Sequence, residues 1–107
     1  MTLQLLAQSQ IADQATIEWN PSALPTAIVI LGGNRTFDAP SPLISGSTYI
    51  LYVQQDATGS RLITWNAIFK WPGGTPPTLS TGANAIDIIS FATDGTNMYG
   101  VAQIGFA

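Results

Sequence analysis

The chain contains no cysteine and no histidine among its 107 residues. Without cysteine it has neither a disulfide framework nor a thiolate metal site. Without histidine it lacks the commonest metal ligand and the commonest general base at neutral pH. A serine nucleophile that depends on histidine is therefore excluded. The sequence predicts no catalytic, cofactor-binding or metal-binding residue.

Charged residues are also scarce, at 8% of the chain, against about a quarter in typical soluble domains. Arg35, Arg61 and Lys70 are the only cations. Three scattered cations do not form the cluster that phosphate groups or an anionic membrane require, so we expect no nucleic-acid and no membrane partner. No apolar run approaches the roughly 20 residues of a membrane-spanning helix. Met1–Ala15 lacks the cationic start and apolar centre of a signal peptide.

Apolar and neutral polar residues make up most of the chain. The hydrophobic fraction is 46%, and serine, threonine, asparagine and glutamine together supply 32 residues. A soluble monomer usually carries more charge, so this composition favours a surface that faces other subunits. The alternative is a soluble domain that neutral side chains keep solvated.

Proline and glycine recur along the chain and leave no room for a long helix. Between them lie β-branched and aromatic runs of strand length. We expect strands at Thr16–Trp19, Ala27–Leu31, Thr36–Phe37, Tyr49–Gln54, Arg61–Trp65, Ile86–Thr93 and Met98–Ile104. The pattern predicts one all-β domain over residues 16–107, a small antiparallel β-sandwich or barrel of jelly-roll type.

Three turns are predicted from their residue types. Asp94–Asn97 and Asp56–Ser60 each combine a capping aspartate with a glycine, which is typical of β-hairpin loops. Gly32–Asn34 is the third turn. Because Asp56 and Asp94 suit these turns, a structural role is preferred for both over a role in glycoside hydrolysis, which needs two facing carboxylates. Alternation along Ile86–Thr93 places Asp87 beside apolar residues, so a buried Asp87 would need a partner such as Arg61 or Lys70.

Two segments are candidate contact surfaces. Met1–Ala15 carries leucines among uncharged polar residues and is interpreted as an extended arm that docks on a neighbour, as an ordinary first strand or as a frayed terminus. Pro72–Gly82 is a long loop rich in proline, glycine and threonine, whose rigidity suits a contact surface.

Aromatic residues offer a further candidate site. Aromatic faces stack on sugars, so a saccharide platform is one interpretation, while burial in the core or in a subunit interface is the preferred one. Trp71, which precedes Pro72, is the one most expected at an edge. The set consists of Trp19, Trp65, Trp71, Tyr49, Tyr52 and Tyr99.

Several motifs in order resemble a β-rich module of tailed-bacteriophage structural proteins, often found at the ends of tail-fibre chains. The resemblance covers Asn34–Phe106. Its motifs are Asn34–Phe37, Pro40–Pro42, Gln55–Asp56, Gly59–Arg61, Phe69–Pro76, Thr78–Thr81, Asn84–Asp87 and Asp94–Thr96. The resemblance implies no catalytic residue, and a fold alone does not fix the function.

The resemblance implies a non-catalytic structural protein of a phage virion. Because the module follows only about 33 residues here, the preferred interpretation is a capsid cement or decoration protein. Such a protein would act as a homotrimer on the major capsid protein, with Met1–Ala15 and Pro72–Gly82 making contacts. The alternative is the receptor-binding head domain of a tail fibre or tail tip, which binds a host surface glycan. A polysaccharide depolymerase that uses Asp87 is the least supported interpretation.

Overall fold

The computed structural model describes residues 10–106, in which eight strands and one short 3-10 turn occur. Within that range no helix has the length and apolar character needed to cross a membrane. The elements are β1 (Thr16–Ile17), β2 (Thr26–Leu31), β3 (Arg35–Phe37), β4 (Thr48–Gln55), β5 (Ile63–Trp65), β6 (Phe69–Lys70), η1 (Pro72–Gly74), β7 (Ile86–Thr93) and β8 (Met98–Phe106). Every predicted strand is present within a few residues, and the predicted all-β fold is confirmed.

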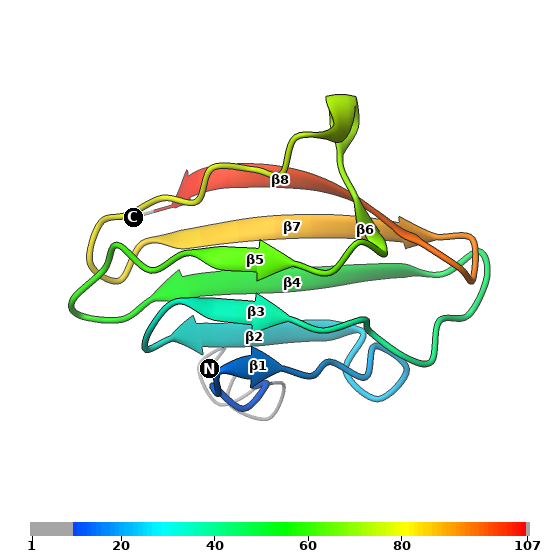
Figure 1. The fold of residues 1–107 in the computed structure, drawn as a ribbon, viewed down its shortest axis with the longest axis horizontal. Helices are drawn as coiled ribbons and strands as arrows, with labels where there is room; N and C mark the ends of the chain where they lie inside the picture. Colours follow the sequence, from blue (N-terminus) through cyan, green and yellow to red (C-terminus); the bar gives the residue numbers. More distant parts are fainter. Residues whose placement is uncertain (1–9, 107) are drawn as a thin grey trace.

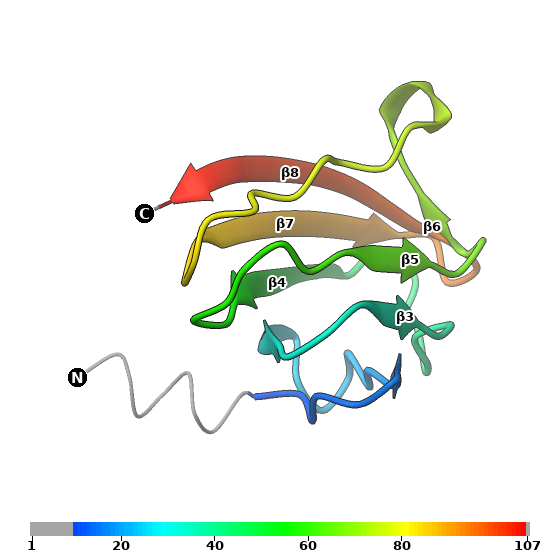
Figure 2. The ribbon, with the colours of Figure 1, turned by 60° about the vertical axis from the view of Figure 1, so that its left-hand side comes forward.

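The strands form two sheets that enclose a single core. One has the order β1-β3-β5 and the other the order β2-β4-β7-β8-β6. The three-stranded sheet lies against one face of the five-stranded sheet (Figures 1 and 2). Ile17 and Phe37 of the smaller sheet and Leu31, Leu51 and Ile89 of the larger one are fully buried between them. Burial of such side chains, at about 1.5–3 kcal/mol each, drives the two sheets together.

The first five strands alternate between the two sheets, and this makes most of their pairings parallel. Strands β1, β3 and β5 pair in parallel, as do β2 and β4. Each crossing to the other sheet reverses the direction of the chain. Two crossings bring the chain back to the first sheet, so the next strand there runs in the same direction as the last one. Only the pairs β4–β7 and β7–β8 are antiparallel, while β6 pairs with β8 in parallel. The pairing is therefore mixed, and the predicted antiparallel arrangement holds only for the C-terminal part of the larger sheet.

One of the two predicted hairpins is confirmed. Asp94–Asn97 joins β7 to β8, with the Asp94 carboxylate accepting hydrogen bonds from the backbone of Thr96 and Asn97 at 2.9 and 2.8 Å. The hairpin predicted at Asp56–Ser60 is wrong, because β4 and β5 lie in different sheets. Strand β4 already has β2 and β7 on its two edges, so no edge remains for β5. The turn at Asp56–Ser60 instead connects β4 to a strand of the other sheet.

Alternation of side chains along the strands follows the prediction. In β7, Asp87, Ile89, Phe91 and Thr93 are buried, and the residues between them are half-buried or exposed. In β4, Tyr49, Leu51, Val53 and Gln55 face the core. The two-residue strand β6 was not predicted, because a single pairing with Met98 and Tyr99 leaves no periodic pattern in the sequence.

Part of the predicted N-terminal arm lies against the β domain. Residues 1–9 lie outside the described residues. Gln10 forms a parallel bridge with Ile28, and Ile11 belongs to the buried core. Asp13 accepts hydrogen bonds from Arg35 Nε at 2.6 Å and Arg35 Nη2 at 2.9 Å, and another from the Gly32 N–H. These bonds, with the Arg35 side chain first, hold the pKa of Asp13 below its ordinary value of 3.8.

The Asp13–Arg35 pair predicts how stability depends on pH. Because the pKa of Asp13 is lower in the folded chain, its contribution is complete above about pH 4 and is lost as the pH falls through the folded pKa. The pair is partly exposed, so we expect a contribution of at most about 1 kcal/mol. Unfolding in denaturant at pH 7 and pH 3 should show that Asp13→Asn lowers stability at pH 7 and flattens the acid-side loss. An equal acid-side loss in the variant would contradict this assignment.

Candidate functional site

Two buried polar side chains fix the loops around one end of the larger sheet. Gln55 is 1% exposed, and its Nε2 donates to the carbonyls of Arg61 at 2.9 Å and Ser80 at 3.0 Å. Its Oε1 accepts from the Arg61 N–H at 2.9 Å. One amide therefore ties the β4–β5 connection to the loop that precedes β7, because every polar group of a buried amide needs a partner.

Asp87 performs a similar role with its carboxylate. It is 2% exposed and accepts hydrogen bonds from Ser80 N and Ser80 Oγ, each at 2.7 Å, and from Gly105 N at 3.0 Å. The predicted partner, Arg61 or Lys70, is wrong: Arg61 pairs instead with Asp56 at 3.0 Å. Three donors satisfy a buried carboxylate without a cation. Asp87 thus positions the loop and the end of β8, and its oxygens are already engaged.

The segment that follows β6 and the strand β8 form a small apolar groove. Its volume is about 240 Å³, and it runs between the segment after β6 and the middle of β8. Its walls are Trp71, Pro72, Thr75, Pro77, Gly100, Val101, Ala102 and Ile104. Turn η1 projects from the body of the molecule beside this groove (Figure 1), and its Gly73 has φ +66°, a conformation that favours glycine. We call this feature the Trp71 groove.

Trp71 is held in place by an aromatic cluster. Its ring lies 5.0 Å from the Trp65 ring, 5.7 Å from Phe91 and 6.4 Å from Phe69. The ring also covers Gly100, where a Cβ atom would come within 2.5 Å of Trp71 Cζ3. Among the buried side-chain polar atoms of the described residues, Trp71 Nε1 has no hydrogen-bond partner. A buried donor without a hydrogen-bond partner costs about 1–3 kcal/mol, so the buried N–H of Trp71 is an unfavourable feature of this fold.

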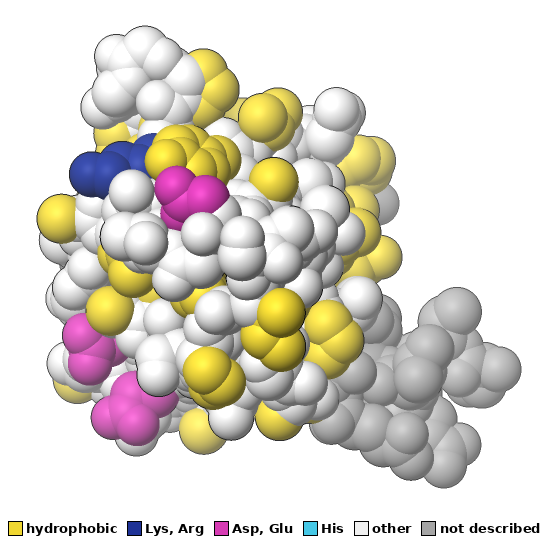
Figure 3. All heavy atoms as spheres, turned by 90° about the vertical axis from the view of Figure 1, so that its right-hand side faces the viewer, with side chains coloured by type: hydrophobic (Ala, Val, Ile, Leu, Met, Phe, Trp, Pro, Cys, Tyr) yellow, Lys and Arg dark blue, Asp and Glu magenta, His cyan; other side chains and the backbone are white. Residues whose placement is uncertain are grey.

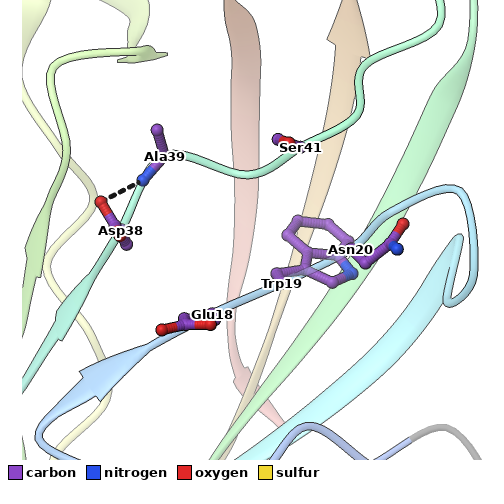
Figure 4. Close-up of a pocket in the computed structure, with 6 residues that line it drawn as sticks. All are labelled: Glu18, Trp19, Asn20, Asp38, Ala39 and Ser41. Carbon is purple, nitrogen blue, oxygen red and sulfur yellow. Dashed lines mark hydrogen bonds between the residues drawn. The ribbon is translucent and has the colours of Figure 1, made fainter.

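A second, more polar pocket lies where the ends of β1 and β3 run side by side. It measures about 330 Å³ and is lined by Glu18, Trp19, Asn20, Asp38, Ala39 and Ser41. Figure 4 shows the two carboxylates on neighbouring segments, with Asp38 accepting from the Ala39 N–H. The indole N–H of Trp19 donates a hydrogen bond to the Leu24 carbonyl, and Trp19 is 3% exposed. This pocket therefore offers hydrogen-bond acceptors and no stacking face.

The remaining acidic side chains serve turns. Asp56 accepts from Arg61 and from the backbone of Gly59 and Thr58, and these bonds hold the pKa of Asp56 below its ordinary value. The Asn97 and Thr96 N–H groups likewise lower the pKa of Asp94. In residues 10–106, no group of three or more Asp and Glu side chains is placed to hold a metal ion. On the end of the molecule that Figure 3 shows, charged side chains are few, and two of the acidic ones lie next to each other.

The saccharide platform, the less favoured interpretation of the aromatic set, does not form a single surface. Trp19 and Tyr49 are buried against each other, and Trp65 stacks on Phe37 at 5.0 Å. Tyr99 is 47% exposed and donates to Asp94. Trp71 is half-buried at the groove edge, as its place before Pro72 predicts. Sequence reasoning missed Gln55, because a buried glutamine at a strand end has no distinguishing pattern.

The contact between Gly100 and Trp71 can be tested by adding one methyl group. Gly100→Ala should destabilise the fold by about 1–3 kcal/mol, because the new Cβ would overlap the Trp71 and Phe91 rings. Gly82→Ala is the matched control, since its nearest neighbour would be 4.0 Å away. Denaturant midpoints measure both. Equal midpoints for the two variants would show that the indole does not lie on β8.

Comparison with protein families gives one match. A family described as "putative phage tail fibre C-terminal domain" matches residues 11–98. Comparisons with curated proteins and with solved structures find no match. The family match begins earlier than the resemblance at Asn34–Phe106 and includes β1 to β7, Trp71 and the loops that Gln55 and Asp87 hold. Since it spans most of the chain, the chain belongs to this family of phage tail fibre C-terminal domains.

Proposed function

We propose that this chain is a non-catalytic structural module of a phage tail fibre, which binds a saccharide of the host surface in the Trp71 groove. The groove carries the proposal, because it combines a positioned indole with an open strand edge. Membership of a tail-fibre family supports the tail rather than the capsid shell.

The chemistry of the groove suits one ring of a sugar polymer. Its volume of about 240 Å³ is below the roughly 300–1,000 Å³ of pockets that enclose a whole drug-sized ligand. Trp71 and the two prolines offer apolar surface to the C–H face of a sugar. Strand β6 pairs only with Met98 and Tyr99, so no strand of the described residues pairs with that edge of β8 beyond Tyr99. Backbone groups there are available to sugar hydroxyls.

Four of the six acidic side chains serve the fold, and the other two, Glu18 and Asp38, line the separate polar pocket rather than the Trp71 groove. Asp87, Asp56, Asp94 and Asp13 each accept hydrogen bonds that shape the fold. Glycoside hydrolysis requires a carboxylic acid and a carboxylate on either side of one sugar linkage. Among residues 10–106, no carboxylate lines the Trp71 groove. A saccharide bound there would therefore be held without being cleaved.

Saccharide binding is tested with paired isoleucine variants. Ile104 and Ile44 are both exposed, but only Ile104 lines the groove. On an array of bacterial surface saccharides, Ile104→Ser should weaken binding by about 5- to 10-fold, the loss expected for part of one apolar contact. Ile44→Ser should bind as the wild type does, and Trp71→Ala should abolish binding. Absence of any saccharide hit, or equal binding by both serine variants, would overturn the proposal.

The alternative proposal, a cement protein on the capsid shell, is favoured by the low charge and neutral surface of the chain. Quantitative mass spectrometry of purified particles separates the two locations. A tail-fibre module should be present at a small fraction of the copies of the major capsid protein. A copy number comparable to that of the capsid protein would instead assign the chain to the shell.

A further inference from the structure

The outer face of the five-stranded sheet, the side away from β1, β3 and β5, is apolar and uncharged. Strand pairing places twelve side chains there in three rows of four. The rows are Thr26, Ile50, Ser90 and Val101; then Ile28, Tyr52, Ile88 and Gln103; then Ile30, Gln54, Ile86 and Phe106. We call this set the outer face. Eight of the twelve are apolar, although water-facing strand positions are normally polar.

Burial separates the outer face from the core side in β7 and β8, whereas Ile28 of β2 is only 5% exposed. In β7, Ser90 is exposed while Ile89 and Phe91 on either side of it are buried. In β8, Val101 is 57% exposed and Phe106 is 44% exposed. All of the core contacts of this sheet are made on its opposite side, where the smaller sheet packs. Among residues 10–106, no strand is layered over the outer face (Figures 1 and 2).

We propose that the outer face is the surface through which this chain associates with a second copy of itself. Its composition supports this partner in particular. Homodimer interfaces are about 65% apolar, whereas interfaces between different, separable proteins are only as apolar as the rest of the surface. The outer face, at eight apolar residues in twelve, matches the first class.

Charge gives an independent reason for self-association. The chain carries a net charge of −3, so two copies repel each other weakly at most orientations. A two-fold symmetric interface brings the same patch of both copies together, so a patch that carried charge of one sign would face like charge. All nine charged residues lie outside the outer face. This is therefore a surface on which two copies meet without repulsion, and it has no charge pattern with which to select a different partner.

The size of the face is consistent with this role. Four strands spaced about 4.8 Å apart, each contributing about five residues of length, give a projected area on the order of 300 Å². The side chains add further accessible surface to this area. An apolar patch of about 300–600 Å² is the largest that a typical monomer exposes. A stable interface takes about 800 Å² from each partner, so the outer face supplies its apolar centre. Exposed Tyr99, one row further along β8, extends it.

A pair of lysine variants tests the interface. Ser90 lies in the outer face and Thr64 lies in β5 of the opposite sheet, and both are exposed strand residues. Neither change removes a buried group, so circular dichroism should show both variants folded. Light scattering after gel filtration, across roughly 1–100 µM, should find the wild-type full chain and Thr64→Lys associated. Ser90→Lys should weaken association at least about tenfold, because it buries an unpaired charge in the contact.

Two results would overturn the inference. A wild-type chain that stays monomeric over the whole range would leave the outer face to another occupant, such as residues 1–9 or a different protein. Association that survives in Ser90→Lys would place the interface elsewhere. A mass of two chains, or of the three expected from the sequence, supports the outer face when Ser90→Lys lowers it. Saccharide binding is measured separately, so failure of either proposal leaves the other standing.

Discussion

Two buried polar side chains, Gln55 and Asp87, fix the loop that precedes β7 at the end of the larger sheet where β4 and β8 finish. Each lies at a strand end of the larger sheet and binds backbone groups of segments distant in sequence. They share Ser80 as a partner, one through its carbonyl and the other through its N–H and hydroxyl. Hydrogen bonds of this kind are weak as net contributions, but they are costly to leave unmade when buried. The loop can therefore adopt few other positions.

Much of the fold was predictable because it depends on local patterns. β-branched and aromatic runs mark β2, β4, β7 and β8, and alternation grouped Asp87 with the residues that share its face of β7, while the structure shows that this face is the buried one. The parallel pairings were not predictable in the same way. Turn residues such as those at Asp56–Ser60 indicate only that the chain reverses or bends. They do not indicate which sheet edge is unpaired and can accept the next strand. That depends on β4 already having two neighbours, which is a property of the whole sheet.

The two proposed binding surfaces were predictable to a smaller extent. The place of Trp71 before Pro72–Gly74 indicated an edge position, and the groove is found there. The partners of Asp87 were not predictable, because its donors are backbone N–H groups and one serine, none of which has a recognisable spacing. In β4 and β7, apolar residues occur on both faces of the strand. Only the register showed that four strands align these residues into one uncharged surface.

The turn η1 has a consequence for how such a module evolves. None of its residues is buried, and it projects beside a groove whose other wall is a regular strand. Exposed loop positions tolerate change that a packed core does not. Substitutions in the segment from Pro72 to Pro77 can therefore alter the shape of one wall while the two sheets stay as they are. Under the proposed saccharide binding, a change in the host's surface polymer would require revision of only this short stretch of chain.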